Sequence, residues 1–390
     1  MKVLITGAFG FVGTNLSAYL AERGHELWAL DVKNALTEAQ SARSVYQKIY
    51  SWDELEKIPW GEVDAVVHLA GKAHDTRNAS DLQSYFDVNV GLTKRVLEAW
   101  AKNISHGDTE NTENGVCCVD KTVTALPTTT PLRTPCLSEK KKFILFSSVK
   151  AVADRVEGVL TEDAVPNPQT PYGQSKMEAE GLLRPRSGRN GECKNGRGAG
   201  GGARLECDRE LARGEPGRCY ILRPCMIHGP GNKGNLNLLY GVVRKGVPWP
   251  LGAFENRRSF ASIGNVCAVV EGLLTGDAAA GVYQVADDEA LSTNELIGLM
   301  ARALGKRPRI WRVPAGLIRC IARCGDVLRL PLNSERLKKL SESYVVSNAK
   351  IKKALGWERM PVSARDGMRK TLESFGMSSL TESQRSQRSF

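Results

Sequence analysis

The feature that most constrains the fold of this 390-residue chain is a glycine-rich turn directly behind its first β-rich run. Residues 2–6 (Lys-Val-Leu-Ile-Thr) form a predicted strand, and a helical pattern over residues 11–23 follows the turn. In such a strand–turn–helix unit, the glycines permit the tight turn, close approach of backbone to a pyrophosphate and close helix packing. The free amides of the helix N-terminus then face the phosphates. The turn therefore predicts dinucleotide binding by Gly7, Phe9, Gly10, Phe11, Val12 and Gly13.

Asp31 indicates which dinucleotide this is. It closes the predicted strand at residues 26–31, 18 residues after Gly13. At that spacing a carboxylate can accept hydrogen bonds from the adenosine ribose hydroxyls, whereas a 2′-phosphate would meet its negative charge. Asp31 therefore favours NAD over NADP. Lys33 nearby keeps NADP open, and a surface loop acid is the alternative interpretation of Asp31.

Short apolar runs alternate with longer helical patterns through the first half of the chain. This alternation is typical of a parallel sheet covered by helices on both faces. We therefore expect an α/β fold, a Rossmann-type doubly wound parallel sheet with a smaller C-terminal substrate-binding lobe. The expected strands cover residues 2–6, 26–31, 65–69, 143–147, 219–223 and 282–285. The expected helices cover residues 11–23, 85–102, 175–183, 235–245, 265–275 and 293–304.

Changes of composition suggest how the chain is divided. Residues 1–223 are the expected NAD-binding Rossmann domain, residues 224–376 mainly the substrate-binding lobe, and residues 377–390 a flexible tail. Two stretches without periodicity, about 103–141 and 184–217, interrupt the first domain. Structureless connections of this length are uncommon inside a compact domain, so both are interpreted as surface insertions. Their role stays open.

Composition narrows the possible partners. A net charge of +11 suits an anionic ligand or nucleic acid, but the basic stretch 184–217 carries no aromatic residues for base stacking, so no nucleic acid is expected. The ten cysteines include no Cys-x-x-Cys pattern, so no metal is expected. No apolar window is long enough for a membrane span, and the sequence opens on a strand and not on a basic leader. We therefore expect a cytoplasmic protein with reduced thiols.

The run His68-Leu69-Ala70-Gly71 marks the next place where backbone is expected to pass the cofactor. It ends the predicted strand at residues 65–69, and its small residues allow close approach. Leu69, Ala70 and Gly71 are therefore expected at the cofactor. His68 could serve as a catalytic base, but it lies before these small residues, which favours a packed strand position.

Three side chains form the candidate catalytic group. Ser148 ends the apolar run Phe143-Ile144-Leu145-Phe146-Ser147-Ser148, while Tyr172 and Lys176 lie one helical turn apart on one face. A neighbouring ammonium favours the phenolate and lowers a tyrosine pKa, so Tyr172 could take a proton from a hydroxyl while carbon loses hydride to the cofactor. Ser148 would hydrogen-bond the reacting oxygen. Tyr-x-x-x-Lys alone could also be an exposed pair; its combination with the glycine turn, Asp31 and the two serines is more specific.

At this point the sequence resembles the extended short-chain dehydrogenases/reductases, specifically the NAD-dependent epimerase/dehydratase family. Within it the chain looks like bacterial nucleotide-sugar 4-epimerases and 4-keto-sugar reductases of surface-polysaccharide synthesis. The resemblance covers nearly the whole chain apart from the two insertions and the tail. It is carried by residues 146–152, Tyr172-Gly173-Gln174-Ser175-Lys176-Met177-Glu178-Ala179-Glu180, Leu222-Arg223-Pro224, His228-Gly229-Pro230-Gly231, Lys233-Gly234-Asn235 and Pro250-Leu251-Gly252.

The resemblance implies a role for each matching residue of the cofactor and catalytic sites. The three glycines of the turn and Asp31 would bind NAD, and Ser148, Tyr172 and Lys176 would be catalytic. Tyr172 and Lys176 would also contact the cofactor, Lys176 at the nicotinamide ribose. Asn89, in Asp87-Val88-Asn89-Val90, would support the cofactor site from the following helix, where the alternative reading is a helix cap.

The resemblance also implies a substrate site. Asn235 and Arg258 match positions that hold a nucleotide diphosphate, and arginine offers a planar fork for phosphate oxygens. Arg257 could take that role instead. The alternative readings are a helix start for Asn235 and a surface charge for Arg258.

Several positions depart from the family pattern. The 4,6-dehydratases of the family carry an Asp-Glu pair where Val149 and Lys150 stand here, which argues against dehydration. Galactose epimerases carry asparagine at the position of Met226, so their sugar contacts cannot be copied. An acidic residue that often lies near the adenine is missing around residues 49–50.

These features together predict an NAD-dependent nucleotide-sugar 4-epimerase that acts on a UDP-hexose or UDP-N-acetylhexosamine through a transient 4-keto intermediate. The alternative is an NAD(P)H-dependent 4-keto nucleotide-sugar reductase, which uses the same three side chains. A non-catalytic nicotinamide-sensing protein is disfavoured because such a protein need not retain all three. The sugar stays open, and a homodimer is left open as a further partner.

Overall fold

The computed structural model describes residues 1–32, 44–72, 82–104, 141–183, 218–232, 234–328 and 333–387. The insertion expected at about 103–141 falls outside this described part of the chain apart from residues 103, 104 and 141, and the insertion expected at about 184–217 falls wholly outside it, as does Lys33. Within it the chain divides into two compact units. The first comprises Met1–Ser147, Pro168–Ile221 and Ala279–Val282; the second comprises Ser148–Asn167, Leu222–Ala278 and Tyr283–Phe390.

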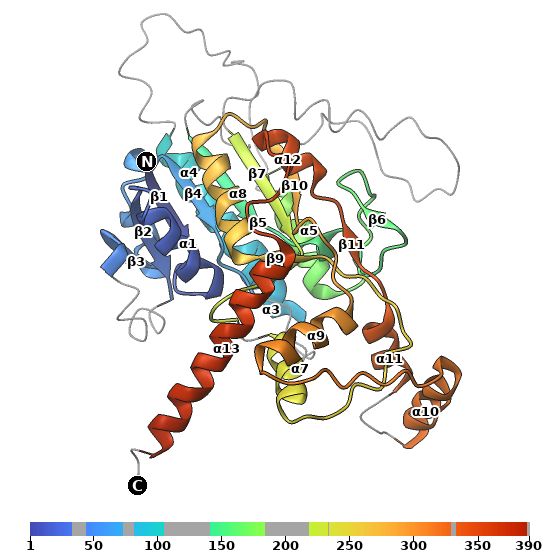
Figure 1. The fold of residues 1–390 in the computed structure, drawn as a ribbon. Helices are drawn as coiled ribbons and strands as arrows, with labels where there is room; N and C mark the ends of the chain where they lie inside the picture. Colours follow the sequence, from blue (N-terminus) through green and yellow to red (C-terminus); the bar gives the residue numbers. More distant parts are fainter. Residues whose placement is uncertain are drawn as a thin grey trace, which may run out of the picture. The chain divides into compact units, whose positions relative to one another are not determined.

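A seven-stranded sheet with the order β10-β7-β5-β4-β1-β2-β3 is the main framework (Figure 1). Neighbouring strands from β5 to β3 pair in parallel; β1 and β2, for example, align Val3 with Leu27. The strands are β1 (Lys2–Thr6), β2 (Glu26–Asp31), β3 (Lys48–Ser51), β4 (Ala65–His68), β5 (Lys142–Phe146), β7 (Arg218–Pro224) and β10 (Gly281–Val285). The expected Rossmann-type parallel sheet is confirmed.

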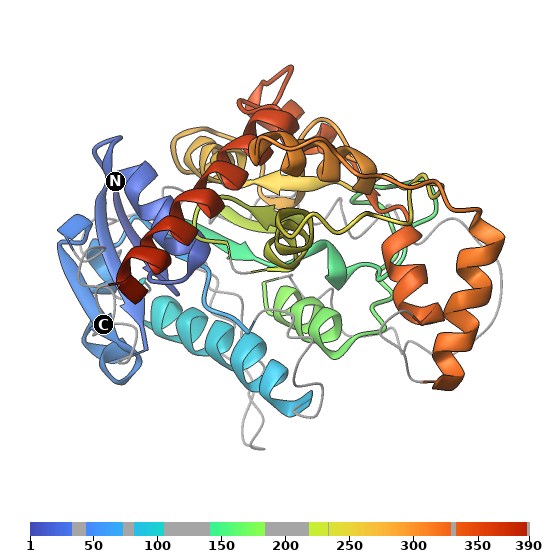
Figure 2. The same ribbon diagram turned by 60° about the horizontal axis from the view of Figure 1, so that its bottom comes forward.

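The order in which the chain enters the strands explains why helices cover both faces of this sheet. The chain passes from β1 to β2 in one direction across the sheet and from β4 to β5 in the other. Because parallel crossovers are right-handed, these steps place α1 (Phe11–Ala21) and α4 (Leu92–Ile104) on opposite faces. Figure 2 shows α4 and α5 (Pro171–Gly181) along the same side of the strands.

Large aromatic side chains fill the core beside α4. Trp28, Trp100 and Phe143 are fully buried, and the rings of Trp100 and Phe143 stack with centroids 5.1 Å apart. Burial of side chains of this size is the main source of stability available to such a layer. The strands themselves are buried along nearly their whole length, as expected for the central strands of a parallel sheet.

Two helices begin or break at points that differ from the sequence expectation. The helix expected from residue 175 begins at Pro171, because Thr170 accepts a hydrogen bond from the Gly173 amide and proline is favoured in the first turn. The helix expected over residues 85–102 is three elements: α3 (Leu82–Phe86), a π-helical turn η4 (Asp87–Gly91) and α4. Single π-turns inside helices often accompany functional sites, and this one carries Asn89.

The second unit contains short strands and several helices. Its strands are β6 (Val159–Leu160), β8 (Met226–His228), β9 (Phe260–Ser262) and β11 (Val345–Val346). Its helices are α7 (Asn235–Arg244), α8 (Ile263–Thr275), α9 (Thr293–Ala303), α10 (Ala315–Leu328), α11 (Ser334–Ser341), α12 (Ala349–Leu355) and α13 (Ala364–Gln387). The expected helices at 235–245, 265–275 and 293–304 correspond to α7, α8 and α9. Among the described residues, no helix is long and apolar enough to cross a membrane.

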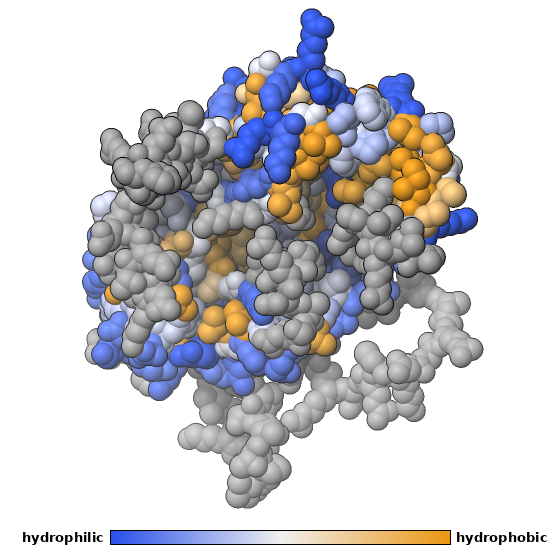
Figure 3. All heavy atoms as spheres, turned by 90° about the horizontal axis from the view of Figure 1, so that it is seen from below, coloured by the Kyte–Doolittle hydropathy of each residue, from blue (hydrophilic) through white to orange (hydrophobic). Residues whose placement is uncertain are grey.

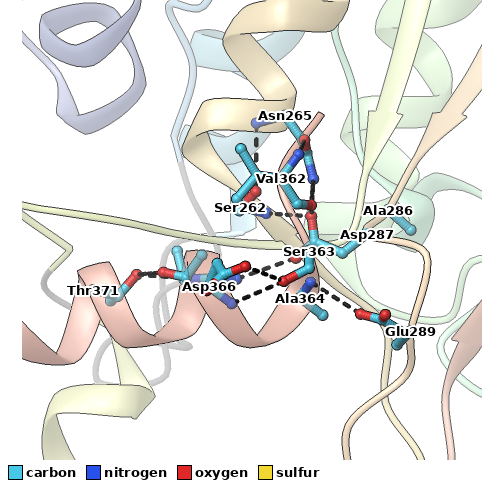
Figure 4. A network of polar contacts seen from close by, with 12 residues as sticks. Ser262, Asn265, Ala286, Asp287, Glu289, Val362, Ser363, Ala364, Asp366 and Thr371 are labelled. Carbon is cyan, nitrogen blue, oxygen red and sulfur yellow. Dashed lines mark hydrogen bonds and ion pairs between the residues drawn. The ribbon is translucent and has the colours of Figure 1, made fainter. Parts of the chain in front are cut away.

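A buried polar network ties α8 to the start of α13 (Figure 4). The Asn265 side chain donates to Asp287 Oδ1 and to the Val362 carbonyl, both at 2.7 Å, and accepts from the Val362 amide at 2.8 Å. Asp287 Oδ1 also accepts from the Ser262 amide at 2.9 Å. Because every polar atom of the Asn265 side chain is satisfied, the network holds these segments in one register.

Candidate active site

The glycine turn, called the cradle below, brings backbone segments too close together for side chains at Gly7 and Gly13. Gly7 has a φ of +65°, and a Cβ there would lie 2.8 Å from the Ala70 amide nitrogen. A Cβ on Gly13 would lie 2.4 Å from the Ala8 carbonyl oxygen. No side chain caps the N-terminus of α1, where Gly10 is the first residue outside the helix. Its amides therefore remain directed toward a ligand in the turn, as dinucleotide binding requires.

Asp31 is held beside this turn by backbone donors. Its Oδ2 accepts from the Phe9 amide at 2.8 Å and its Oδ1 from the Val32 amide at 2.8 Å. The side chain is buried at the end of β2, so its negative charge is fixed next to the turn. Each oxygen keeps a second lone pair, which could accept a ribose hydroxyl.

Tyr46 packs against the same turn, and the sequence did not predict it as a residue of this site. Its hydroxyl donates to the Ala8 carbonyl at 3.2 Å, and its ring meets the Phe9 ring edge-on with centroids 5.6 Å apart. Burial raises the pKa of Tyr46 to about 12, so the hydroxyl keeps its proton. Tyr46 follows the residues outside the described part of the chain, and no local pattern marks it.

His68 is a packed strand residue and not a base. Its Nδ1 lies 2.8 Å from Thr6 Oγ1, and its Nε2 lies 3.0 Å from Thr93 Oγ1. Because the Thr93 hydroxyl donates to the Asn89 carbonyl at 2.6 Å, it can only accept from His68, which places the proton on Nε2. Burial, with a smaller contribution from the Lys176 charge, lowers the pKa of His68 to about 3. The ring therefore stays neutral.

Lys176 lies where the ends of β4 and β5 meet α5. Its Nζ donates to the Phe146 carbonyl at 3.0 Å, and a Cβ on Gly71 would lie 3.0 Å from the same nitrogen. Burial lowers the pKa of Lys176 to about 8, against a smaller opposing contribution from Glu180. The absence of a side chain at Gly71 thus leaves room for this amine at the expected cofactor loop.

Asn89 links that loop to the helix of the candidate catalytic pair. Its Oδ1 accepts from the Lys72 amide at 2.9 Å, and its Nδ2 donates to Ser175 Oγ at 2.9 Å. Ser175 Oγ in turn donates to the Tyr172 carbonyl at 2.9 Å. The side chain of Asn89 is almost fully buried, so these bonds fix the first turn of α5 against the loop.

Tyr172 is half-buried and contacts a second tyrosine. Its ring meets the Tyr85 ring edge-on with centroids 6.1 Å apart. Lys72 Nζ lies 4.9 Å from the centre of the Tyr85 ring and also hydrogen-bonds Ser84. Sequence reasoning missed Tyr85, Lys72 and Ser175, because nothing local connects them with Tyr172.

The two serines behind β5 have different surroundings. Ser147 donates to Glu180 Oε1 at 2.5 Å, and this hydrogen bond joins it to α5. Ser148 begins the second unit, where its Oγ accepts from the Lys150 amide at 3.2 Å and caps the turn at Val149–Ala151. The Ser148 hydroxyl can still donate its own proton, whereas the Ser147 proton is engaged by Glu180.

Two cations lie together in the second unit. Burial lowers the pKa of Arg258 and that of Lys150, and the Arg258 charge adds to the lowering at Lys150. Arg258 Nε donates to the Glu342 carbonyl at 3.2 Å, and Lys150 Nζ lies 4.4 Å from the centre of the Tyr344 ring. Arg257, the sequence alternative, is exposed, so burial favours Arg258. Asn235 is the first residue of α7, and its side chain lies outside the described part of the chain.

Comparison with known proteins places these features in a family. Residues 3–197 match the model of the NAD dependent epimerase/dehydratase family. A UDP-glucose 4-epimerase of Vibrio cholerae is 27% identical over 96% of this chain and 95% of its own length. An N-acetyl-α-D-glucosaminyl-diphospho-ditrans,octacis-undecaprenol 4-epimerase of Escherichia coli O157:H7 is 26% identical over 90% of this chain and 85% of its own.

A solved structure supports the fold. The UDP-glucose 4-epimerase of Thermotoga maritima, determined with UDP-glucose, superposes with a TM-score of 0.63 over 97% of this chain and 99% of its own. It is 19% identical, so it bears on the fold alone. The expected cofactor, NAD, agrees with the family and with the cradle formed by Gly7, Gly13 and Asp31. This chain belongs to the NAD-dependent epimerase/dehydratase family.

Proposed function

We propose that this protein is an NAD-dependent 4-epimerase of a nucleotide sugar, either a UDP-hexose or a UDP-N-acetylhexosamine. The observation that supports it most is the position of Lys176, whose buried amine lies against Gly71 and the Phe146 carbonyl, one helical turn after Tyr172. A relative that matches this chain over nearly its whole length carries the same activity in its name. In this proposal residues 1–223 bind NAD and residues 224–376 mainly bind the substrate.

Tyr172 exchanges the proton of the reaction in this proposal. NAD, when bound, supplies a reversible hydride acceptor for carbon 4 of the sugar. Tyr172 takes the proton of the 4-hydroxyl and later returns it, while Ser148 hydrogen-bonds the same oxygen. Lys176, one helical turn after Tyr172, would hold the nicotinamide ribose and place its amine beside the cofactor loop. The 4-keto sugar would turn over in the pocket, and the bound cofactor would then supply the hydride to its other face.

The remaining candidate residues hold the cofactor and substrate. The glycine turn (Gly7, Gly10, Gly13) with Phe9, Phe11 and Val12 receives the pyrophosphate of NAD, and Asp31 receives the adenosine ribose. Leu69, Ala70 and Gly71 line the nicotinamide side, and Asn89 positions this loop. Arg258 and Asn235 hold the diphosphate of the substrate, and Lys150 beside Arg258 adds positive charge. Val149 and Lys150 leave no Asp-Glu pair for removal of water, which favours epimerisation over dehydration.

The test uses purified full-length protein without added cofactor. UDP-hexoses and UDP-N-acetylhexosamines are incubated separately, and NMR follows the ratio of 4-epimers. The proposal predicts interconversion of at least one pair to a fixed ratio with no net change in reduced cofactor. If no pair interconverts but added NADH is oxidised in the presence of a 4-keto sugar, the protein is the alternative reductase.

Tyr172→Phe is the matched variant, because it removes only the hydroxyl. It should abolish turnover while leaving NAD bound, since the cradle of α1 is untouched. Unchanged turnover in this variant would contradict the assignment of Tyr172.

A further inference from the structure

The helix α10 carries apolar side chains on two faces; among the described residues of its unit, one face is packed in a cluster and the other is exposed. Ile318 and Ala322 are buried in a cluster with Leu251 and Leu337. Leu317, Cys320, Ile321 and Cys324 are all exposed, and at this i, i+3, i+4, i+7 spacing they form one continuous stripe. We call these four residues the α10 stripe. Scattered exposed apolar residues need no explanation, but a contiguous stripe on one helix marks an interaction surface.

The sequence on either side of this stripe is rich in basic residues. Residues 302–342 contain eleven Lys and Arg against three Asp and Glu, a surplus of eight in a chain of net charge +11. Arg319 and Arg323 follow the stripe on the same helix and are exposed. In the described part of the chain, no ion pair engages either of them. Exposed Arg312 precedes the helix together with Trp311, an aromatic residue that is 59% exposed.

The figures agree with this arrangement. Figures 1 and 2 show α10 beside α11 as a pair of helices, whose shared cluster includes Leu337. Figure 3 shows that orange apolar atoms gather in patches on the surface, with blue hydrophilic atoms beside them. Leu340 of α11 is also partly exposed and adds to the apolar surface of the pair.

We propose that α10 docks this protein on an anionic lipid surface, with the stripe in the headgroup–acyl boundary and the arginines at the phosphates. An amphipathic helix with an apolar stripe on one face and arginines on another is suited to lie in this interface, and the exposed Trp311 precedes it in the chain. A second copy of the chain is the less suitable occupant, because pairing of the same face would bring two strongly basic surfaces together. This inference is independent of which sugar the protein acts on.

The experiment measures co-sedimentation of the full chain with lipid vesicles. The protein is mixed with vesicles of phosphatidylcholine alone and with vesicles that also contain phosphatidylglycerol. We expect binding to the anionic vesicles, weak binding to the neutral ones, and loss of binding as salt is raised. Equal binding to both vesicle types, or none to either, would overturn the proposal.

Variants test whether vesicle binding depends on the α10 stripe or is non-specific adsorption. Leu317→Ser and Ile321→Ser should each weaken partition to anionic vesicles about tenfold, because each removes one aliphatic side chain from the lipid. Arg319→Glu with Arg323→Glu should remove the preference for phosphatidylglycerol. Leu82→Ser is the control, because Leu82 is 53% exposed against 54% for Leu317 and lies in the other unit.

Two readouts keep the result interpretable. Thermal melting should be unchanged in all the variants, since their side chains are exposed, so lost binding cannot reflect unfolding. Sedimentation equilibrium without lipid tests the other occupant. The protein could fail to bind anionic vesicles and instead self-associate through an interaction that Leu317→Ser abolishes. That result would assign the α10 stripe to a second copy of the chain and overturn the lipid proposal.

Discussion

Gly71 positions two polar groups by lacking a side chain. A Cβ at this residue would lie 2.7 Å from Asn89 Oδ1 and 3.0 Å from Lys176 Nζ. Both atoms lie on buried side chains with hydrogen bonds of their own, so neither can move without losing one. The site therefore depends on glycine here for space and not for an unusual φ.

Gly71→Ala should lower kcat about tenfold or more through displacement of Lys176, and the hydrogen bond lost in the displacement should also lower the melting temperature. The control is Gly181→Ala on α5, where an added Cβ would meet nothing within 4 Å. Steady-state kinetics of both variants on the substrate identified by NMR make the comparison. Equal kcat in the two variants would show that Lys176 does not need this space.

His68 gives a prediction for stability against pH. On folding, the pKa of His68 falls from 6.5 to about 3. Between these pH values the ring is therefore protonated in the unfolded chain and neutral in the folded chain. The stability associated with the neutral ring is therefore complete above pH 6.5 and is lost as the pH falls toward 3. The loss of stability that this pKa shift causes between pH 6.5 and pH 3 amounts to about 5 kcal/mol.

The measurement compares urea unfolding of the native protein and His68→Asn as the pH is lowered from 6.5. The native protein should lose stability more steeply, because the variant has no ring to protonate. If the free energy of unfolding has the same dependence on pH in the two proteins, folding does not lower the pKa of His68.

At the scale of elements, α5 joins the two features that matter most for the site. Thr170 and Pro171 fix its start, and Lys176 and Glu180 follow Tyr172 toward the ends of β5. The π-turn η4 supplies Asn89 to the same helix through Ser175. The helix is thus held on two sides, at its first turn by Asn89 and along its length by β5.

The segment between α8 and α13 depends on one side chain. Asn265→Ala removes three hydrogen bonds of a fully buried amide and leaves Asp287 and the Val362 backbone groups without that partner. We expect a loss of about 3 kcal/mol in the free energy of unfolding and a lower melting temperature. Thr275→Ala, at the exposed end of the same helix, should change either value by less than about 0.5 kcal/mol.

Calorimetry or circular dichroism of the two variants settles this comparison. NAD binding should survive in Asn265→Ala at temperatures below its transition, because the glycine turn lies in the other unit. A melting temperature equal to that of Thr275→Ala would show that the network of Figure 4 contributes no net stability.

At the scale of the whole molecule, the sequence predicted what local chemistry determines. The glycine turn, Asp31, the Ser-Ser strand end and the Tyr172/Lys176 pair each combine a residue type with a fixed spacing on one element. Pairing of parallel strands then brings the ends of β1, β4 and β5 to one edge of the sheet. The fold class and the expected cofactor could be reached from these patterns.

Contacts between distant segments could not be reached in this way. Tyr46 meets the glycine turn 38 residues away from Ala8, and Asn89 meets Ser175 across 86 residues. Lys150 and Arg258 likewise share the distant partner Tyr344, which forms a β-bridge with Arg258 and whose ring centre lies 4.4 Å from Lys150 Nζ. Such partners depend on packing and leave no periodic signal in the sequence.

Reversible exchange of hydride at carbon 4 within one active site can be followed with an isotope label. The protein is incubated with UDP-sugar deuterated at carbon 4, without added cofactor, and both epimers are analysed by NMR. The account predicts that deuterium stays on carbon 4 of the newly formed epimer, because the same hydride leaves and returns. Loss of deuterium from carbon 4 during interconversion would contradict it.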